Sequence, residues 1–379
     1  MKCVRPLLAV APLLLPVPLE AHERVETETG PMTVETFADG LEHPWGIAFL
    51  PDGSALVTER AGNLRHVDGE GELSRPISGV PRVVAAGQGG LLDVALHPEF
   101  SDNRMVYLTF SEPGEDGTNG TAVARGVLSA GNGALENVEV IFRQEPKVRS
   151  NGHFGSRLQF DNDGLLWVTL GERQQARYRV LAQDLRTHLG KVIRIRDDGS
   201  VPDGNPFIGR NDARPEIWSW GHRNPQGMDL HPETGEVWIH EHGPRGGDEL
   251  QAPEAGMNYG WPEFSYGREY SGGRIGSGES HAPQFVEPFH QWTPSIAPSG
   301  LAFYDGEAIP AWRGDILVGA LAAQKLVRLD VEGGRVVGSE DLLAGLGKRI
   351  RDVEVGPDGA VYLLTDESNG EILRLTTAE

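Results

Sequence analysis

Two polar clusters near the middle of the chain contain the residue types that binding and catalysis use. They span Trp218–Gly227 and His240–Glu249, and they combine arginines, imidazoles, amides and carboxylates with several glycines. A purely structural segment seldom needs so much polar chemistry beside such flexible backbone. The clusters therefore predict a binding or catalytic site.

The sequence between the clusters predicts the elements that position them. Met228–Pro232 and Glu236–Ile239 are typical of two short strands joined by the turn Glu233–Gly235. Both clusters then lie at strand ends, where loops present functional groups. A structural alternative remains for Arg223 and Asn224, in which the asparagine forms a turn and the arginine pairs with a surface acid.

The composition favours a turn-rich, all-β protein. Among 379 residues there are 50 glycines and 26 prolines, and the hydrophobic residues, 39% of the chain, occur in short runs. At a usual size of roughly 150 residues per domain, the chain would form two or three domains, but repetitive β folds often form one larger domain. The net charge of −21 argues against nucleic acid or an anionic membrane surface as a partner, while it allows a local basic pocket.

The first residues predict export. Lys2 and Arg5 precede the apolar run Pro6–Leu19, and Ala21 stands near a plausible cleavage point. We therefore expect a secretory signal peptide over residues 1–21 and a periplasmic or secreted protein, because the run is too short and too rich in proline for a membrane-spanning helix. The only cysteine, Cys3, would be removed with it, which leaves no disulfide or thiolate chemistry.

A strand–turn–strand pattern recurs along the rest of the chain and predicts its architecture. Six copies begin near residues 45, 91, 157, 227, 299 and 353. These intervals fit a propeller blade of about 40–50 residues with insertions. Each hairpin has an apolar face that its neighbours must cover, so we predict an all-β, single-domain, six-bladed β-propeller over residues 34–376. A β-sandwich is the alternative, but sandwiches lack this self-similarity.

Four long insertions are expected to crowd one face of the ring. They cover residues 113–120, 144–156, 173–188 and 258–292. Loops that build a groove over a rigid ring form a natural small-molecule site, so we expect the active site on that face.

Six motifs occur in an order that resembles one known family. They lie at residues 87–98, 153–158, 221–227, 243–249, 258–262 and 349–352. Over about residues 34–375 the chain resembles the soluble glucose/sorbosone dehydrogenases, and especially the bacterial periplasmic aldose sugar dehydrogenases. The resemblance implies a propeller that uses pyrroloquinoline quinone (PQQ) and calcium. Its reaction would oxidise aldose sugars at the C1 hydroxyl to lactones and pass electrons to an unidentified acceptor.

The resemblance assigns the catalytic base to His153. Oxidation at C1 removes a hydroxyl proton and a hydride, so a base with a pKa near neutrality is needed beside the cofactor. By residue type alone a histidine is more often structural, so the motif carries this assignment. The family's better-known glucose dehydrogenase has an aspartate immediately before this histidine, where this chain has Gly152. The orientation and basicity of His153 must then come from another residue.

The resemblance also assigns residues to the quinone, a tricarboxylate that needs local cations in an acidic protein. Arg349 and Arg351 alternate on an expected strand and so point to the same side, as a carboxylate clamp would; two solvated arginines are the alternative. Arg223 would lie against the reacting carbonyl and stabilise the developing oxyanion. Asn224 would hold the edge of the cofactor, and Gln88 would face the substrate.

Calcium would take oxygen ligands, backbone carbonyls included. Gly243 and Pro244 match the family's carbonyl ligands beside the quinone, and Glu249 and Tyr259 match positions of a second, structural calcium. As bare sequence, the acidic pair at residues 248 and 249 would more often be solvated than a ligand set.

One departure from the family supports a different reading. Where relatives read Gly-Ala-Leu-Lys, this chain has Gly319–Ala322, so a cofactor-binding lysine is missing unless Lys325 reaches back. Together with Gly152, this favours a non-catalytic propeller that binds a sugar or a protein partner, whereas His153 and the arginines favour the enzyme. A calcium-dependent lactonase would need a central ring of Glu, Asn and Asp ligands, which the sequence does not supply. The preferred sugar, and whether the protein is a monomer or a homodimer, stay open.

Overall fold

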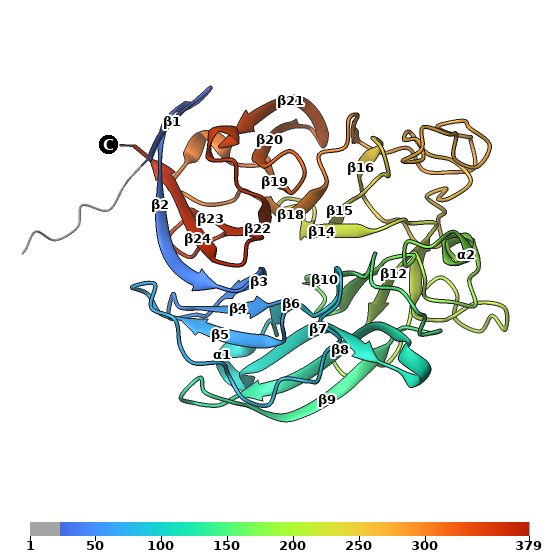
Figure 1. Ribbon diagram of the computed structural model, residues 1–379, viewed down its shortest axis with the longest axis horizontal. Helices are drawn as coiled ribbons and strands as arrows, with labels where there is room; N and C mark the ends of the chain where they lie inside the picture. Colours follow the sequence, from blue (N-terminus) through green and yellow to red (C-terminus); the bar gives the residue numbers. More distant parts are fainter. Residues whose placement is uncertain (1–22, 379) are drawn as a thin grey trace, which may run out of the picture.

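The computed structural model describes residues 23–378, and six β-sheets surround a central axis in it (Figure 1). The predicted signal peptide and Cys3 lie outside the described residues. The predicted all-β, six-bladed propeller is confirmed. Within residues 23–378 no helix is long and apolar enough to cross a membrane.

Each sheet is one blade, and the first strand of every blade lies innermost. Blade 1 consists of β3 (Pro44–Phe49), β4 (Ala55–Glu59) and β5 (Asn63–Val67). Blade 2 consists of β6 (Leu91–Leu96), β7 (Met105–Pro113), β8 (Asn119–Leu128) and β9 (Leu135–Arg143). Blade 3 consists of β10 (Gly155–Phe160), β11 (Leu166–Leu170), β12 (Lys191–Ile195) and β13 (Ile217–Trp220). Blade 4 consists of β14 (Pro225–Leu230), β15 (Val237–Glu241), β16 (Asp248–Gln251) and β17 (His290–Trp292). Blade 5 consists of β18 (Pro298–Phe303), β19 (Ile316–Ala320), β20 (Lys325–Glu332) and β21 (Arg335–Leu342).

Blade 6 joins the two ends of the described chain. It consists of β22 (Ile350–Val355), β23 (Val361–Thr365), β24 (Gly370–Thr377), β2 (Gly30–Leu41) and β1 (Glu23–Thr27). The N-terminal strand β2 pairs antiparallel with β24, and Figure 1 shows these blue and red strands side by side. The ring is therefore closed by backbone hydrogen bonds between segments that are far apart in sequence.

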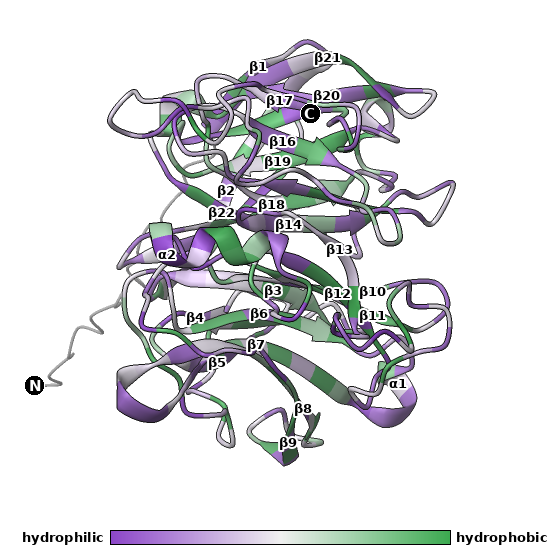
Figure 2. Ribbon diagram, turned by 90° about the vertical axis from the view of Figure 1, so that its right-hand side faces the viewer, coloured by the Kyte–Doolittle hydropathy of each residue, from purple (hydrophilic) through white to green (hydrophobic). Residues whose placement is uncertain are grey.

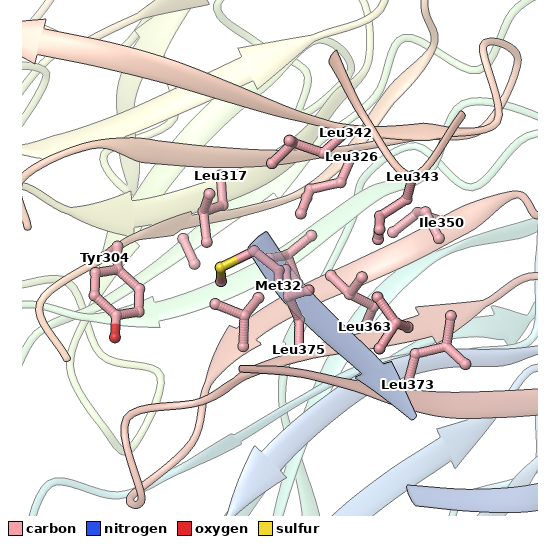
Figure 3. Packing of buried hydrophobic residues seen from close by; sticks show 14 of the residues in the cluster. Met32, Tyr304, Leu317, Leu326, Leu342, Leu343, Ile350, Leu363, Leu373 and Leu375 are labelled. Carbon is pink, nitrogen blue, oxygen red and sulfur yellow. The ribbon is translucent and has the colours of Figure 1, made fainter. Parts of the chain in front are cut away.

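Apolar packing between neighbouring blades forms the core. Figure 2 shows apolar residues concentrated on the strands, while many of the connecting loops are hydrophilic. In one such layer Met32 from β2 meets Leu317 of blade 5 and Leu363 of blade 6, all of them buried (Figure 3). The short helices are peripheral insertions: α1 (Phe100–Asn103), α2 (Ala176–Arg179) and the 3₁₀ turns η1 (Glu115–Gly117), η2 (Val180–Gln183), η3 (Pro310–Trp312) and η4 (Ala344–Leu346).

A buried arginine connects the innermost strands at the axis. Arg157 of β10 pairs with Asp93 of β6 at 3.0 Å and with Asp352 of β22 at 2.9 Å. Its Nε donates to the Gln226 carbonyl of β14 at 3.0 Å, and its guanidinium lies 4.7 Å from the ring centre of Trp45 in β3. Burial raises the pKa of Asp93 to about 7, against the pull of Arg157. One side chain thus links five of the six inner strands.

Replacing this arginine should destabilise the ring in a pH-dependent way. Removing one partner of a buried ion pair costs about 3–5 kcal/mol, so Arg157→Met should lower the free energy of unfolding by that order at pH 8. The loss should shrink at pH 5, because Asp93 and Asp352, whose pKa values burial already raises, then take up protons. Urea unfolding at both pH values measures this. Arg210→Met, which removes an exposed pair with Asp212, is the control and should change little; an equal loss for both variants would contradict the account.

Candidate active site

A cavity of about 250 Å³ lies at the beginning of the inner strands, over the axis. Its walls include Trp45 of β3, Gly155 of β10 and Gln226 of β14, each near the first residue of its strand. Two of the four predicted loop insertions contribute to it, through Phe154 and Tyr270. The insertions 113–120 and 173–188, both fully described, do not line it. A separate cavity of about 310 Å³ opens at the other ends of the same strands.

The predicted arginine clamp lies together in the cavity wall. Arg349 and Arg351 both pair with the carboxylate Oδ2 of Asp366, at 3.2 and 3.1 Å, and His43 contacts its other oxygen at 3.2 Å. Burial by itself raises the pKa of Asp366, but the Arg351 and Arg349 charges hold it well below its usual range. Arg351 also donates to Gln226 Oε1 at 3.3 Å. The two guanidiniums therefore share one permanently ionised partner.

The predicted base, His153, is buried directly behind this wall. Its backbone N–H donates to Gln88 Oε1 at 2.7 Å, and Gln88 itself lines the cavity. Its ring Nδ1 lies 2.9 Å from Glu172 Oε1. Burial, with the charges of Arg223 and Arg173, lowers the pKa of His153 well below 6.5. The imidazole is therefore neutral at neutral pH, and its pKa is lower than the near-neutral value expected for the base.

Glu172 supplies the orientation that Gly152 cannot. It is 1% exposed, and burial raises its pKa to about 7 while Arg223 opposes that rise. At residue 152 the space for a side chain is taken by Gln174, whose Oε1 would lie 2.0 Å from an added Cβ. The aspartate of the better-known relative would thus not fit here unless Gln174 moved.

Arg173 fixes the loop that carries His153. It is fully buried and donates to the carbonyls of Gly152 at 3.1 Å and Ser150 at 2.6 Å. It also bonds the carbonyl and the side chain of Asn119 on blade 2, and its guanidinium stacks 3.8 Å from the ring centre of Phe154. Burial lowers its pKa to about 9, which still leaves it charged at neutral pH.

Arg223 and Asn224 lie at the same end of the ring. Arg223 is 5% exposed, and its Nη1 donates to the carbonyls of His242 at 2.9 Å and Gly243 at 3.0 Å. Its Nε has no partner among the described residues. Asn224 lines the cavity and accepts a hydrogen bond from the Gly155 N–H at 3.1 Å. The structural alternative, an arginine paired with a surface acid, does not describe Arg223, which is buried and bonds carbonyls.

The predicted calcium residues fall into two places. Gly243 and Pro244 form a loop that Asp248 holds, since the Gly243 N–H donates to Asp248 Oδ1 at 2.7 Å. Glu249 lies opposite Glu241 across β15 and β16, and burial, with the Glu241 charge, raises its pKa well above the usual range. Tyr259 stacks on His222, which in turn bonds Glu241. In the described part of the chain no three His, Cys, Asp or Glu side chains form a metal cluster.

The predictions from sequence missed five residues of the site, and a shared position could have found four of them. Arg60, Glu172 and Asp366 each come one or two residues after the second strand of a blade. His242, which lines the cavity, follows β15 in the same way. Polar residues at this point of the repeat are therefore a signal for the site. Arg173 gives no such signal, because its partners are distant in sequence.

A cationic cavity beside a buried neutral histidine, on a six-bladed propeller, is a site suited to an anionic ligand. The chain belongs to the glucose/sorbosone dehydrogenase family, whose family model matches residues 41–374. Aldose sugar dehydrogenase YliI of Escherichia coli K12 is 46% identical over 347 residues, covering 91% of this chain and 93% of that protein. The predicted family and the prediction of an oxidoreductase are confirmed.

Two solved structures support this at the level of the fold. A crystal structure of a glucose dehydrogenase is 51% identical, with a TM-score of 0.88, and covers 92% of this chain and 100% of its own. The PQQ-bound form of the aldose sugar dehydrogenase from Streptomyces coelicolor is 28% identical, with a TM-score of 0.74, and covers 91% of this chain and 98% of its own.

Truncating Arg173 should loosen the histidine loop. Arg173→Met keeps much of the side-chain volume but leaves buried carbonyls unsatisfied, so the free energy of unfolding should fall by roughly 1–3 kcal/mol. Chemical denaturation measures it. The matched control is Arg177→Met, which removes an exposed hydrogen bond to Gln175 and a contact with the Tyr178 ring. If both variants unfold alike, Arg173 does not hold this loop.

Proposed function

We propose that this protein oxidises aldose sugars at the C1 hydroxyl to lactones, with PQQ and calcium as cofactors, and passes the electrons to a separate acceptor. The observation that carries the proposal is the buried pair His153–Glu172, whose Nδ1 to Oε1 distance is 2.9 Å, beside a cavity walled by arginines. The family and the PQQ-bound relative support it. Export to the periplasm or the medium is part of the same proposal.

The donor groups of the cavity fit a flat polyanion. Its wall holds the guanidiniums of Arg60, Arg349 and Arg351 in a chain whose net charge is −21. Nε of Arg223 and Nε of Arg351 are buried donors without a partner in the described chain. Bidentate guanidinium groups suit carboxylates. PQQ, once bound, would supply the hydride-accepting chemistry, and Arg349, Arg351 and Asn224 would hold it.

His153 would take the proton of the sugar hydroxyl. Glu172 accepts from the Nδ1 side of the ring, which leaves Nε2 as the nitrogen that can accept a proton. The hydrogen bonds that His153 makes within residues 23–378 involve its backbone N–H and Nδ1, not Nε2. When the ring gains the proton, the Glu172 carboxylate stabilises the imidazolium. Gln88 would hold the sugar, since its side chain lines the cavity and contacts the His153 backbone.

Arg223 would stabilise negative charge at the reacting oxygen. It is close enough to lower the pKa of His153 by its charge, and its Nε is uncommitted among the described groups. A preorganised cation at a developing oxyanion typically lowers the barrier by several kcal/mol, on the order of 3. Both the base and the cation are therefore held in place by the loops at one end of the ring.

Calcium would bind at two places. The carbonyls of Gly243 and Pro244 would face the cofactor, whose own oxygens would complete the shell. The Gly243 carbonyl, which accepts from Arg223 at 3.0 Å, would use its second lone pair for the ion. Glu249 and Tyr259 would hold a second, structural ion. The adjacent carboxylates of buried Glu241 and half-buried Glu249 support this. Burial raises the pKa of Glu249 and the Glu241 charge raises it further, and a cation would relieve that repulsion.

The alternative, a propeller that binds but does not catalyse, receives less support from the site. Its best argument was the missing lysine at Ala322, and Lys325 does not replace it, because Lys325 pairs with Asp341 at 2.6 Å on blade 5. The histidine, its carboxylate partner and the arginine wall are nevertheless all in place.

Reconstitution tests the function directly. Metal-free apo-protein should gain dye-linked activity with aldoses only when both PQQ and Ca²⁺ are added, and the product should be the lactone. His153→Ala should still bind PQQ but lose about 10²–10⁴-fold in turnover, since a positioned base contributes that much. Full activity in excess chelator, or an active His153→Ala variant, would refute the proposal.

The pH dependence should report the His153–Glu172 pair. Turnover should fall as the pH drops through about 7, because Glu172, whose pKa burial raises to about 7, then loses the charge that stabilises imidazolium. In Glu172→Gln the acidic limb of the pH–rate profile should move to lower pH, since the pKa of His153 lies well below 6.5. Turnover of this variant should be lower than that of the wild type at every pH. Pre-steady-state rates from pH 5 to 9 measure it; an unchanged limb in the variant would exclude Glu172 from this role.

A further inference from the structure

Arg60 stands in the cavity wall at the end of β4, where blade 1 meets the axis. Its backbone is fixed, because its N–H donates to the His43 carbonyl at 3.1 Å and its carbonyl accepts from the Leu91 N–H at 3.2 Å. Gly90 makes room for it: a Cβ there would lie 1.9 Å from the Arg60 carbonyl oxygen and 2.7 Å from its Cγ. The chain is thus shaped to hold this side chain against the cavity.

The Arg60 guanidinium has no hydrogen-bond or ion-pair partner anywhere in residues 23–378. The acid next to it in sequence, Glu59, is already taken, because it pairs with Arg65 and accepts from Asn63 and from the Glu42 N–H. The other arginines of the wall are committed: Arg349 to Asp366 and the Leu321 carbonyl, and Arg351 to Asp366 and Gln226. Arg60 is the uncommitted cation of the wall.

The charges of the wall show why a further cation matters. Arg349 and Arg351 share the Asp366 carboxylate, so that cluster carries a net charge of +1 (two cations, one anion). His242 adds nothing, because burial lowers its pKa well below 6.5. Arg60 brings the wall to +2. Burial lowers the pKa of Arg351, while that of Asp366 is raised by burial and lowered by the Arg351 and Arg349 charges. The charge of Arg60 adds a smaller lowering to both pKa values, so it reaches the clamp.

From this geometry we infer that Arg60 binds a carboxylate of the anionic cofactor, as a third guanidinium of the cavity wall beside Arg349 and Arg351. The inference rests on the proposed use of PQQ. Ala322, where relatives carry a lysine, follows β19 of blade 5, whereas Arg60 follows β4 of blade 1. The cation would therefore be supplied from another blade of the same ring.

Calorimetric titration of apo-protein with PQQ in the presence of Ca²⁺ tests this without any activity readout. Arg60→Met should raise the dissociation constant about tenfold or more, since a charge-assisted hydrogen bond is lost. Arg60→Lys should retain part of the affinity. The matched control is Arg75→Met, which removes the same charge from an exposed position outside the cavity and should bind like the wild type.

Two further comparisons make the outcome decisive. Ala322→Lys in the Arg60→Met background should recover affinity, and binding by Arg60→Met should weaken less with added salt than wild-type binding. Equal affinity of wild type and Arg60→Met would overturn the inference while the proposed function stands. Failure of the wild type itself to bind PQQ would overturn both.

Discussion

The buried contact of Arg157 with Asp93 and Asp352 is the constraint on which the rest of the structure depends. A propeller has no covalent ring, so its blades must be fixed relative to one another at the axis. Here one guanidinium bonds three inner strands and stacks on Trp45 of a fourth. The same strands begin at the active-site cavity, and Asp352 is next to Arg351 of the clamp. The contacts of Arg157 therefore fix, relative to one another, the inner strands whose first residues line the active-site cavity.

The charges of the active site are only partly neutralised by partners within the protein. The chain is strongly acidic, yet its cavity is cationic, because Asp366 compensates only part of the arginine charge. Behind the cavity wall, burial favours the uncharged forms: it keeps His153 neutral and raises the pKa of Glu172. His153 has a left-handed backbone with φ of 50°, a conformation that costs free energy in a residue with a side chain. The bonds of Arg173 to the preceding loop offset this cost.

The sequence predicted the blades because each hairpin repeats the same apolar alternation, and the expected copy starts fall within three residues of β3, β6, β10, β14, β18 and β22. The pairing of Arg349 with Arg351 was predictable from strand alternation alone. Arg60, Glu172 and Asp366 share a place after the second strand of a blade, which was not used as a signal. Arg173 was not identified because its role depends on contacts with Asn119, Ser150 and Gly152, which lie far from it in sequence. Gly152 looked like a defect in sequence. In the structure Glu172 supplies the partner from another strand end, and Gln174 fills the space.

The central claim is that His153 is a neutral base whose Nδ1 proton is held by Glu172. Nitrogen-15 NMR of the histidine side chains at pH 8 tests it most directly, with the His153 signals assigned by difference from His153→Gln. The account predicts a neutral ring protonated at Nδ1, which changes to the other tautomer or to a mixture in Glu172→Gln. An imidazolium at that pH, or a ring protonated at Nε2 in the wild type, would contradict it.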